Sequence, residues 1–219
     1  MAITVCPVTP GFVAEIGDID LSTPLEPADL LAVKEAFTTY AVLIFPDQHL
    51  SQDQHLDFAR NFGPLETTIA LFRKDAKLRL RKEFADVSNL DADSKVWGEN
   101  SRRRMFELGN RLWHTDSSFK RLPARASLLY ARSIPPVGGH TEFADERAAY
   151  DALPEDMRRR LQVYTHRWRV HDLVIWDDRC TMHRGTGFDD LRWQRDLQRA
   201  TVSDIANSCE QEGIAVAAA

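Results

Sequence analysis

The sequence lacks several features that would narrow its class at once. It has only three cysteines in 219 residues, and an odd count without regular spacing predicts reduced thiols rather than a disulfide framework. No apolar run reaches the roughly 18 residues that a membrane span needs. The first residues lack a basic segment followed by an apolar one, so we expect no secretory signal and a cytoplasmic protein. Internal repeats and low-complexity linkers are also missing.

The charge balance gives no reason to expect a nucleic-acid partner, because the net charge is -5 at pH 7. Charged residues make up 28% of the chain and hydrophobic residues 43%, which is typical of a soluble globular protein. A chain of 219 residues is long enough for one domain with a sizeable core. We therefore expect a single domain over residues 1–219, with neither a nucleic-acid nor a membrane partner.

Short apolar runs separated by proline and glycine predict a mainly-β fold with helical decoration. Strands are expected at residues 3–6, 12–16, 41–45, 86–90, 126–131, 140–143, 163–170, 172–176 and within 195–204. Helices are expected from Pro27, after a capping box at Ser51–Gln54, after Asp145 and from Pro154. Because the helices gather mostly toward the N-terminus, this pattern favours a jelly-roll core. The polar stretch 91–109 is expected to form a mobile loop, and such loops often cover sites.

A His-x-Asp pair, His114 and Asp116, is the first candidate for chemistry. Residues two positions apart in an extended segment point to the same side, so an imidazole nitrogen and a carboxylate oxygen could reach one metal ion. A third ligand would complete the two-histidine, one-carboxylate set that suits non-haem Fe(II) in oxygenases. The pair alone is weak, because seven histidines are present and a solvated loop pair would look the same.

Four motifs in order make the interpretation specific. They are His114-x-Asp116, the Gly-Gly-x-Thr of 138–141, the Trp-Asp-Asp-Arg-x(3)-His-Arg of 176–184 and the Arg-x(3)-Arg-Ala-Thr of 195–201. Together they resemble the taurine dioxygenase family of Fe(II)- and 2-oxoglutarate-dependent dioxygenases, whose fold is a double-stranded β-helix. Within that family the chain looks most like the branch that acts on 2,4-dichlorophenoxyacetate in herbicide-degrading bacteria. The likeness runs from the N-terminus to about Asp204.

The resemblance implies a role for six residues. His114, Asp116 and His183 match the iron ligands. Thr141 and Arg195 match the residues that hold the distal carboxylate of 2-oxoglutarate, and Arg199 matches the arginine that faces the acidic group of the substrate. In a strand, Arg195 and Arg199 share a face, and a guanidinium fork suits a carboxylate. Without the motif context, two surface arginines would explain this pair as well.

The chain departs from the family in two places. One extra residue stands between His183 and Arg195, which makes Arg192 a competitor for the cosubstrate role. We prefer Arg195 because the residues behind it stay in register. The separation of Asp116 and His183 is also much shorter than in the resembling sequences. A helix-like segment runs straight into a strand-like one near 161–163 without loop residues, so we expect a segment to be missing there.

The resemblance implies hydroxylation of an aryloxyacetate such as 2,4-dichlorophenoxyacetate next to its ether oxygen. The products would be a phenol, glyoxylate, succinate and CO2, with Fe(II) as cofactor and 2-oxoglutarate and O2 as cosubstrates. A homo-oligomer is expected. A taurine-like sulfonate or another alkanoate oxygenase would use the same iron site. A non-catalytic jelly-roll binding protein and a zinc hydrolase are the alternatives from other classes.

Overall fold

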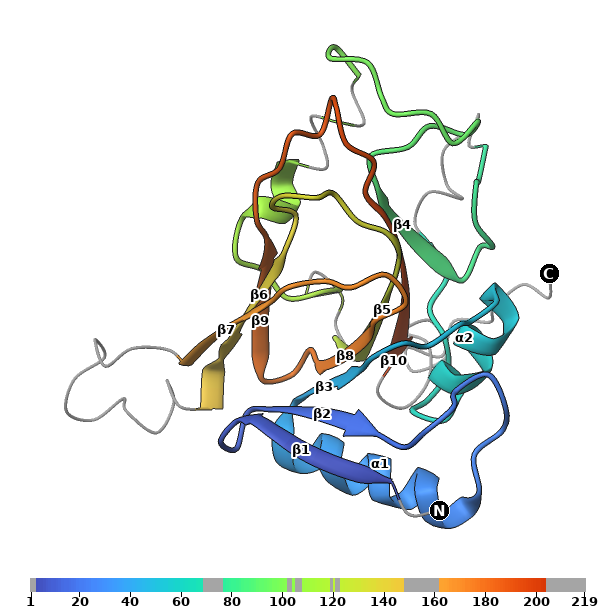
Figure 1. The fold of residues 1–219 in the computed structure, drawn as a ribbon, viewed down its shortest axis with the longest axis vertical. Helices are drawn as coiled ribbons and strands as arrows, with labels where there is room; N and C mark the ends of the chain where they lie inside the picture. Colours follow the sequence, from blue (N-terminus) through green and yellow to red (C-terminus); the bar gives the residue numbers. More distant parts are fainter. Residues whose placement is uncertain are drawn as a thin grey trace.

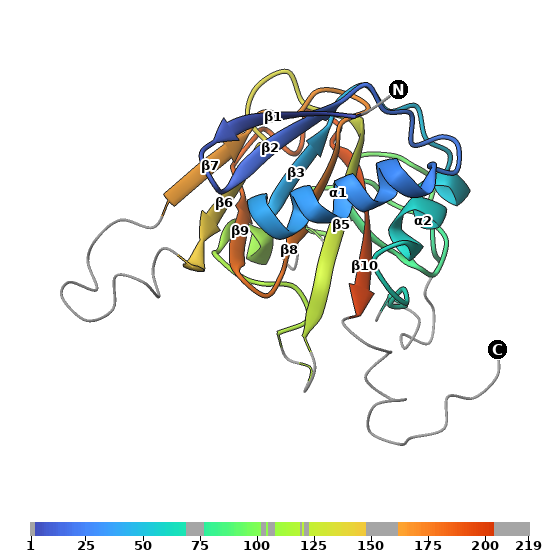
Figure 2. The same ribbon diagram turned by 90° about the horizontal axis from the view of Figure 1, so that it is seen from below.

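The computed structural model describes residues 3–68, 77–101, 104, 108–118, 120, 123–147 and 162–203. In this part of the chain two β-sheets pack against each other, and two α-helices lie on the outer face of the larger sheet (Figures 1 and 2). This arrangement confirms the predicted mainly-β class with helical decoration. No helix among the described residues is both long enough and apolar enough to cross a membrane.

The larger sheet is built from strands that are distant in sequence. Its order is β1 (Thr4–Thr9), β2 (Val13–Gly17), β3 (Val42–Phe45), β8 (Leu173–Asp177), β5 (Ala124–Ser133), β10 (Asp196–Ser203) and β4 (Phe84–Ser88). Strands β2 and β3 are parallel, and the other neighbours are antiparallel. The C-terminal strand β10 therefore lies inside the sheet, between β5 and β4.

The smaller sheet has the order β7 (Gln162–His166), β6 (Thr141–Asp145) and β9 (Thr181–Gly185), all antiparallel. Its central strand β6 sends Phe143 toward Trp176 of β8, with their ring centroids 5.4 Å apart. Phe143, Trp176 and Leu197 belong to one buried apolar cluster between the two sheets. That layer supports the candidate site.

A second apolar cluster joins the outer face of the larger sheet to the helices. Helix α1 (Pro27–Tyr40) starts with proline in its first turn, where no backbone N–H is needed, and buries Val33, Ala36 and Phe37. Helix α2 (Gln52–Arg60) begins at the predicted capping box: the Ser51 hydroxyl accepts from Gln54 N–H, and the Gln54 side chain accepts from Ser51 N–H. The sequence prediction of both helices is confirmed.

Some element boundaries differ from the prediction. Strand β7 ends at His166 instead of residue 170, because the carboxylate of Asp172 accepts the backbone N–H of Arg169 and His171 takes a positive φ of 71°. Strand β9 and the 3₁₀ helix η2 (Leu108–Arg111) were not predicted. The helices expected after Asp145 and from Pro154 lie outside the described residues, apart from the start of the first.

Candidate metal centre

His114 and His183 are joined by the backbone. His114 N–H donates to His183 O at 3.1 Å, and His183 N–H donates to His114 O at 2.9 Å, so the two residues form an isolated antiparallel bridge. Their rings lie 4.3 Å apart between centroids. The segment around His114 is therefore an extra edge piece beside β9, and it carries the first histidine directly onto the second.

Asp116 completes a compact group of three possible ligands. One ligand atom from each of His114, Asp116 and His183 can be chosen so that all three lie within 4.8 Å of one another. His114 Nε2 is 3.9 Å from Asp116 Oδ1, and His183 Nε2 is 3.7 Å from Asp116 Oδ2. Asp116 and His183 are buried, whereas the His114 side chain is 30% exposed. The group is therefore partly exposed to solvent on the His114 side.

The protonation states of the histidines fit a metal ligand set. Burial lowers the pKa of His183 to about 3, with His114 and Arg199 adding to the shift and Asp116 opposing it. His183 is therefore neutral near pH 7, as a ligand must be. His114 Nδ1 lies 2.8 Å from Leu112 O, and donation from Nδ1 leaves the Nε2 lone pair for a metal. Two imidazoles and a carboxylate are the donor set of non-haem iron.

Both oxygens of Asp116 have partners. Arg199 Nη1 lies 2.6 Å from Oδ1, and the Ser127 hydroxyl lies 2.8 Å from Oδ2. Burial alone would raise the pKa of Asp116, but the positive charge of Arg199 and the hydrogen bond from Ser127 outweigh it, so the pKa lies below its usual value. Asp116 is consequently ionised and able to bind a cation.

Asp178 lies behind this carboxylate and behaves oppositely. Its Oδ2 is 2.8 Å from the same Ser127 hydroxyl, and its Oδ1 accepts from Trp176 Nε1 at 2.8 Å. Burial, reinforced by the negative charge of Asp116, raises the pKa of Asp178 well above its usual value. The surroundings thus move the pKa values of two adjacent acids in opposite directions.

The glycines at 138 and 139 shape the loop before Thr141. Both have positive φ, and a Cβ at Gly138 would meet the carbonyl oxygen of Gly187 at 2.2 Å. Glycine is therefore required for this turn. Thr141 begins β6, is buried, and accepts a hydrogen bond from Trp168 Nε1 at 3.0 Å.

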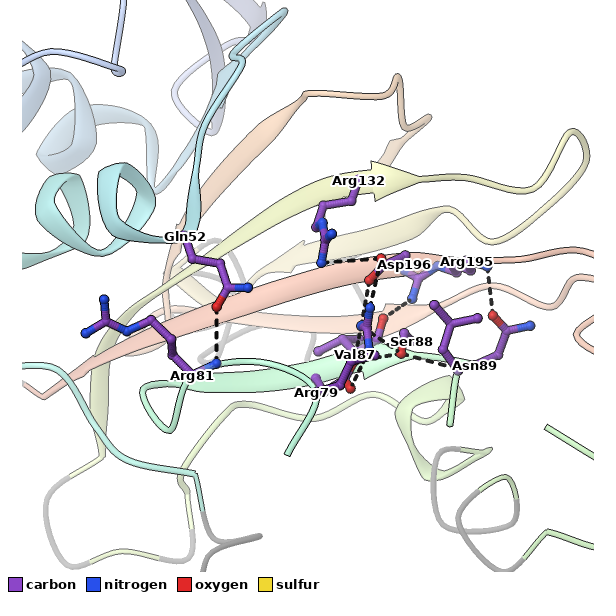
Figure 3. Close-up of polar contacts among 11 residues, drawn as sticks. Gln52, Arg79, Arg81, Val87, Ser88, Asn89, Arg132, Arg195 and Asp196 are labelled. Atoms are coloured by element: carbon purple, nitrogen blue, oxygen red, sulfur yellow. Dashed lines mark hydrogen bonds and ion pairs between the residues drawn. The ribbon is translucent and has the colours of Figure 1, made fainter. Parts of the chain in front are cut away.

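Arg195 lies against the same loop, and Figure 3 shows it beside Asn89. Its Nε donates to Gly139 O at 3.1 Å, its Nη1 donates to Val87 O at 3.4 Å, and its backbone N–H donates to Asn89 Oδ1 at 2.8 Å. It also lines a cleft. The other lining residues are Val87, Ser88, Asn89, Trp97, Arg104, Leu108, Asn110, Arg111, Gly185, Thr186, Phe188 and Asp190. The structure therefore brings Arg195 beside the Thr141 segment and next to the end of β9.

Arg192, the competitor for the same role, lies elsewhere. It is exposed in a turn, and its guanidinium stacks over the Trp193 ring at 4.7 Å. It does not line the cleft. This geometry favours Arg195 as the residue for the cosubstrate.

Ser127, Asp178 and Asn89 were missed by the sequence reasoning. Ser127 had a visible signal, because it is a small polar residue in a stretch of β5, Ala126–Ala131, whose other members are alanine, leucine and tyrosine. Asp178 is the second acid of a Trp-Asp-Asp-Arg turn, and the sequence alone does not show which acid points inward. Asn89 gave no signal, because its contact with Arg195 depends on strand pairing across more than 100 positions.

Two facing sheets that carry two histidines and one carboxylate at one end define the class of non-haem iron oxygenases with a jelly-roll fold. The model of the "Taurine catabolism dioxygenase TauD, TfdA family" matches residues 4–165. The chain therefore belongs to this family. It is an Fe(II)- and 2-oxoglutarate-dependent dioxygenase, in agreement with the sequence prediction.

Individual relatives agree with the family match. The chain is 32% identical to an alpha-ketoglutarate-dependent 2,4-dichlorophenoxyacetate dioxygenase of Cupriavidus pinatubonensis, over 94% of this chain and 99% of the relative. It is 36% identical to an (S)-phenoxypropionate/alpha-ketoglutarate-dioxygenase of Sphingobium herbicidovorans, over 78% of this chain and 54% of that protein. A crystal structure of AAD-2 in complex with Mn(II) and N-oxalylglycine superimposes with a TM-score of 0.79 at 32% identity, covering 93% and 97% of the two chains.

Proposed function

We propose that this dioxygenase hydroxylates an aryloxyalkanoate, such as 2,4-dichlorophenoxyacetate, at the carbon next to the ether oxygen. The resulting hemiacetal collapses to a phenol and glyoxylate, while 2-oxoglutarate and O2 give succinate and CO2. The likeness to the Cupriavidus enzyme over nearly the whole of both chains is the observation that carries this substrate assignment. Such a substrate combines an apolar aryl ring with a short acidic arm, so its site would have to accept an apolar group and an anion together.

The roles of the site residues belong to the same proposal. His114, Asp116 and His183 would hold the Fe(II), which supplies the O2-activating redox chemistry that side chains lack. Their closeness, the neutral state of His183 and the ionised state of Asp116 support this assignment. Cosubstrate and substrate would approach the iron from the side of half-buried His114, which is partly exposed to solvent.

Two arginines would each bind one carboxylate, one from the cosubstrate and one from the substrate. Arg195, fixed to Gly139 beside the Thr141 segment, would bind the distal carboxylate of 2-oxoglutarate with the Thr141 hydroxyl. Arg199 would take the substrate carboxylate. Its Nε is buried and finds no hydrogen-bond partner among the described residues, so part of its donor capacity is unused. A buried donor without an acceptor is costly, and a bound carboxylate would relieve that cost.

The substrate assignment is tested by a panel. Wild-type enzyme with Fe(II), 2-oxoglutarate and O2 is given 2,4-dichlorophenoxyacetate, both enantiomers of a 2-aryloxypropionate, taurine and a long-chain alkyl sulfate, and succinate is measured for each. The proposal predicts the highest kcat/KM for an aryloxyalkanoate, with phenol released. A higher value for taurine or the alkyl sulfate would replace it with a sulfonate or sulfate-ester oxygenase.

We also propose that a segment is absent from this sequence near 161–163. Support comes from the alignment with the Cupriavidus enzyme, which extends over 286 residues although this chain has 219. Strand β7 begins at Gln162, and residues 157–161 just before it include no glycine, proline, asparagine or aspartate, the residue types that loops favour. Either the segment belongs to the chain and is left out of this sequence, which we favour, or it is deleted. The intact mass of the native protein decides, because the present chain weighs 25.0 kDa.

A further inference from the structure

Ser127 connects Asp116 to Asp178. Its hydroxyl oxygen is 2.8 Å from Asp116 Oδ2 and 2.8 Å from Asp178 Oδ2, and its side chain is completely buried. We propose that Ser127 and Asp178 are positioning residues, which hold the Asp116 carboxylate in the orientation that binds the metal. The inference rests on the proposed role of Asp116 as an iron ligand.

Asp116 needs such support because its own backbone gives little. The bridge to β9 is isolated at His114, and Asp116 already lies in a turn, followed by Ser117 at a positive φ of 54°. No strand ladder fixes Asp116. Its orientation therefore depends on groups that reach it from the larger sheet.

Asp178 reaches Asp116 at two points. Through Ser127 it contacts the carboxylate, and its own Oδ1 accepts the backbone N–H of Asp116 at 3.4 Å. Asp178 itself is held firmly, since its Oδ1 accepts from Trp176 Nε1 at 2.8 Å and its backbone N–H donates to Arg125 O at 3.1 Å. Trp176 is fully buried in β8, and its ring lies 4.6 Å from that of His183. The pair thus links the Asp116 turn to the strands that support another ligand.

Ser127 also balances the pull of Arg199. The guanidinium holds Oδ1 at 2.6 Å, so without the hydroxyl on Oδ2 the carboxylate would be free to turn toward Arg199. Partners of metal-ligating groups typically contribute 10- to 100-fold to metal affinity or activity. A loss of that size is expected when the hydroxyl is removed.

The test measures metal affinity, because a merely structural role would leave it unchanged in folded protein. Mn(II) is titrated into purified apoprotein, and free Mn(II) is followed by electron paramagnetic resonance. Ser127→Ala and Ser127→Cys should both weaken Mn(II) binding about 10- to 100-fold. The cysteine variant keeps the volume but loses the strong hydroxyl donor, so it remains informative if the alanine variant folds poorly. Tyr130→Phe is the matched control, since Tyr130 lies in the same strand and donates to Gln48 O on the opposite face.

Asp178 is tested by two substitutions with opposite expected results. Asp178→Asn should stay within about threefold of the wild-type affinity, because its amide can donate to Ser127 while its carbonyl accepts from Trp176. Asp178→Leu removes both contacts and should match Ser127→Ala. The inference is overturned if Ser127→Ala and Ser127→Cys bind Mn(II) as tightly as Tyr130→Phe does. It is also overturned if Asp178→Asn binds Mn(II) as weakly as Asp178→Leu does. If instead His114→Ala binds Mn(II) like the wild type, the proposed ligand set itself is wrong.

Discussion

Arg199 Nη1 lies 2.6 Å from Asp116 Oδ1, so the arginine that we assign to the substrate carboxylate also contacts a proposed iron ligand. The contact ties recognition of the substrate to the metal site at the level of single atoms. It also offers a competing role for Arg199, as a charge partner of Asp116 alone. If Arg199 binds the substrate, its removal lowers the preference for an acidic substrate; if it only pairs with Asp116, its removal lowers the affinity for the metal.

Arg199→Ala should weaken the binding of an aryloxyalkanoate substrate by at least 30-fold, because removing one member of a buried charge pair costs about 2–5 kcal/mol. The measurement is kcat/KM for the acid and for its methyl ester, with Arg132→Ala, a more exposed arginine on β5, as control. The preference for acid over ester should fall in the variant. If Mn(II) affinity drops and that preference stays at the wild-type level, Arg199 serves only Asp116.

Arg195→Gln should raise the KM for 2-oxoglutarate steeply while leaving Mn(II) affinity near the wild-type value. The reason is that Arg195 is anchored to Gly139 at the cleft, and the residues that line this cleft do not include the three proposed ligands. Arg192→Gln, in the exposed turn, is the comparison and should change neither quantity. A large effect of Arg192→Gln with a small effect of Arg195→Gln would require a different register after His183.

Arg79→Met should destabilise the fold by about 3–5 kcal/mol, because it removes the buried arginine that pairs with both Asp86 and Asp196, and Arg132, at 3.5 Å, remains for Asp196 alone. The Arg79 side chain is 7% exposed, and it pairs with Asp86 on β4 and with Asp196 on β10, each at 2.7 Å (Figure 3). Urea denaturation gives the free energy of unfolding. Arg81→Met is the control, since Arg81 is largely exposed and pairs with Asp53 at the surface, where a salt bridge contributes about 0–1 kcal/mol. A similar loss of unfolding free energy in both variants would contradict the view that Arg79 stabilises the pairing of β4 with β10.

The stability of the apoprotein should fall as the pH is lowered below about 6.5. Burial lowers the pKa of His55 from 6.5 to about 3, so between these values the unfolded chain binds a proton that the folded chain does not. Unfolding is therefore favoured as pH falls, by about 1.4 kcal/mol per pH unit for one such group. His55→Gln should reduce the slope of unfolding free energy against pH by nearly that amount, whereas exposed His49→Gln should not. An unchanged slope in His55→Gln would show that His55 is protonated in the folded state.

Local signals in the sequence predicted the elements that local interactions determine. The capping box at Ser51–Gln54 gave the start of α2, and the apolar run before Pro46 gave β3. The end of β7 was missed because it depends on the side chain of Asp172, six positions beyond His166. Strand β9 was missed because its buried positions hold the polar residues Thr181 and His183, so the sequence shows no apolar alternation there, and the strand depends on pairing with β6.

The candidate site follows the same division. Motifs named His114, Asp116 and His183, but only the backbone bridge between the two histidines shows how they meet. The motif around Arg195 likewise could not show its anchoring by Asn89, since the two residues come together only when β4 pairs with β10. Ser127 was visible as a hydroxyl in an apolar strand, yet its two carboxylate partners are 11 and 51 positions away.

The measurement closest to the central claim is succinate formation by three single variants at saturating Fe(II), with 2-oxoglutarate and 2,4-dichlorophenoxyacetate present. His114→Ala, Asp116→Ala and His183→Ala should each form no succinate above the protein-free rate, because a site that loses one of three ligands holds Fe(II) poorly. His49 is exposed and lies outside the group of three, so His49→Ala should form succinate at the wild-type rate. Near-normal succinate formation in any one of the three would remove that residue from the ligand set and contradict the account.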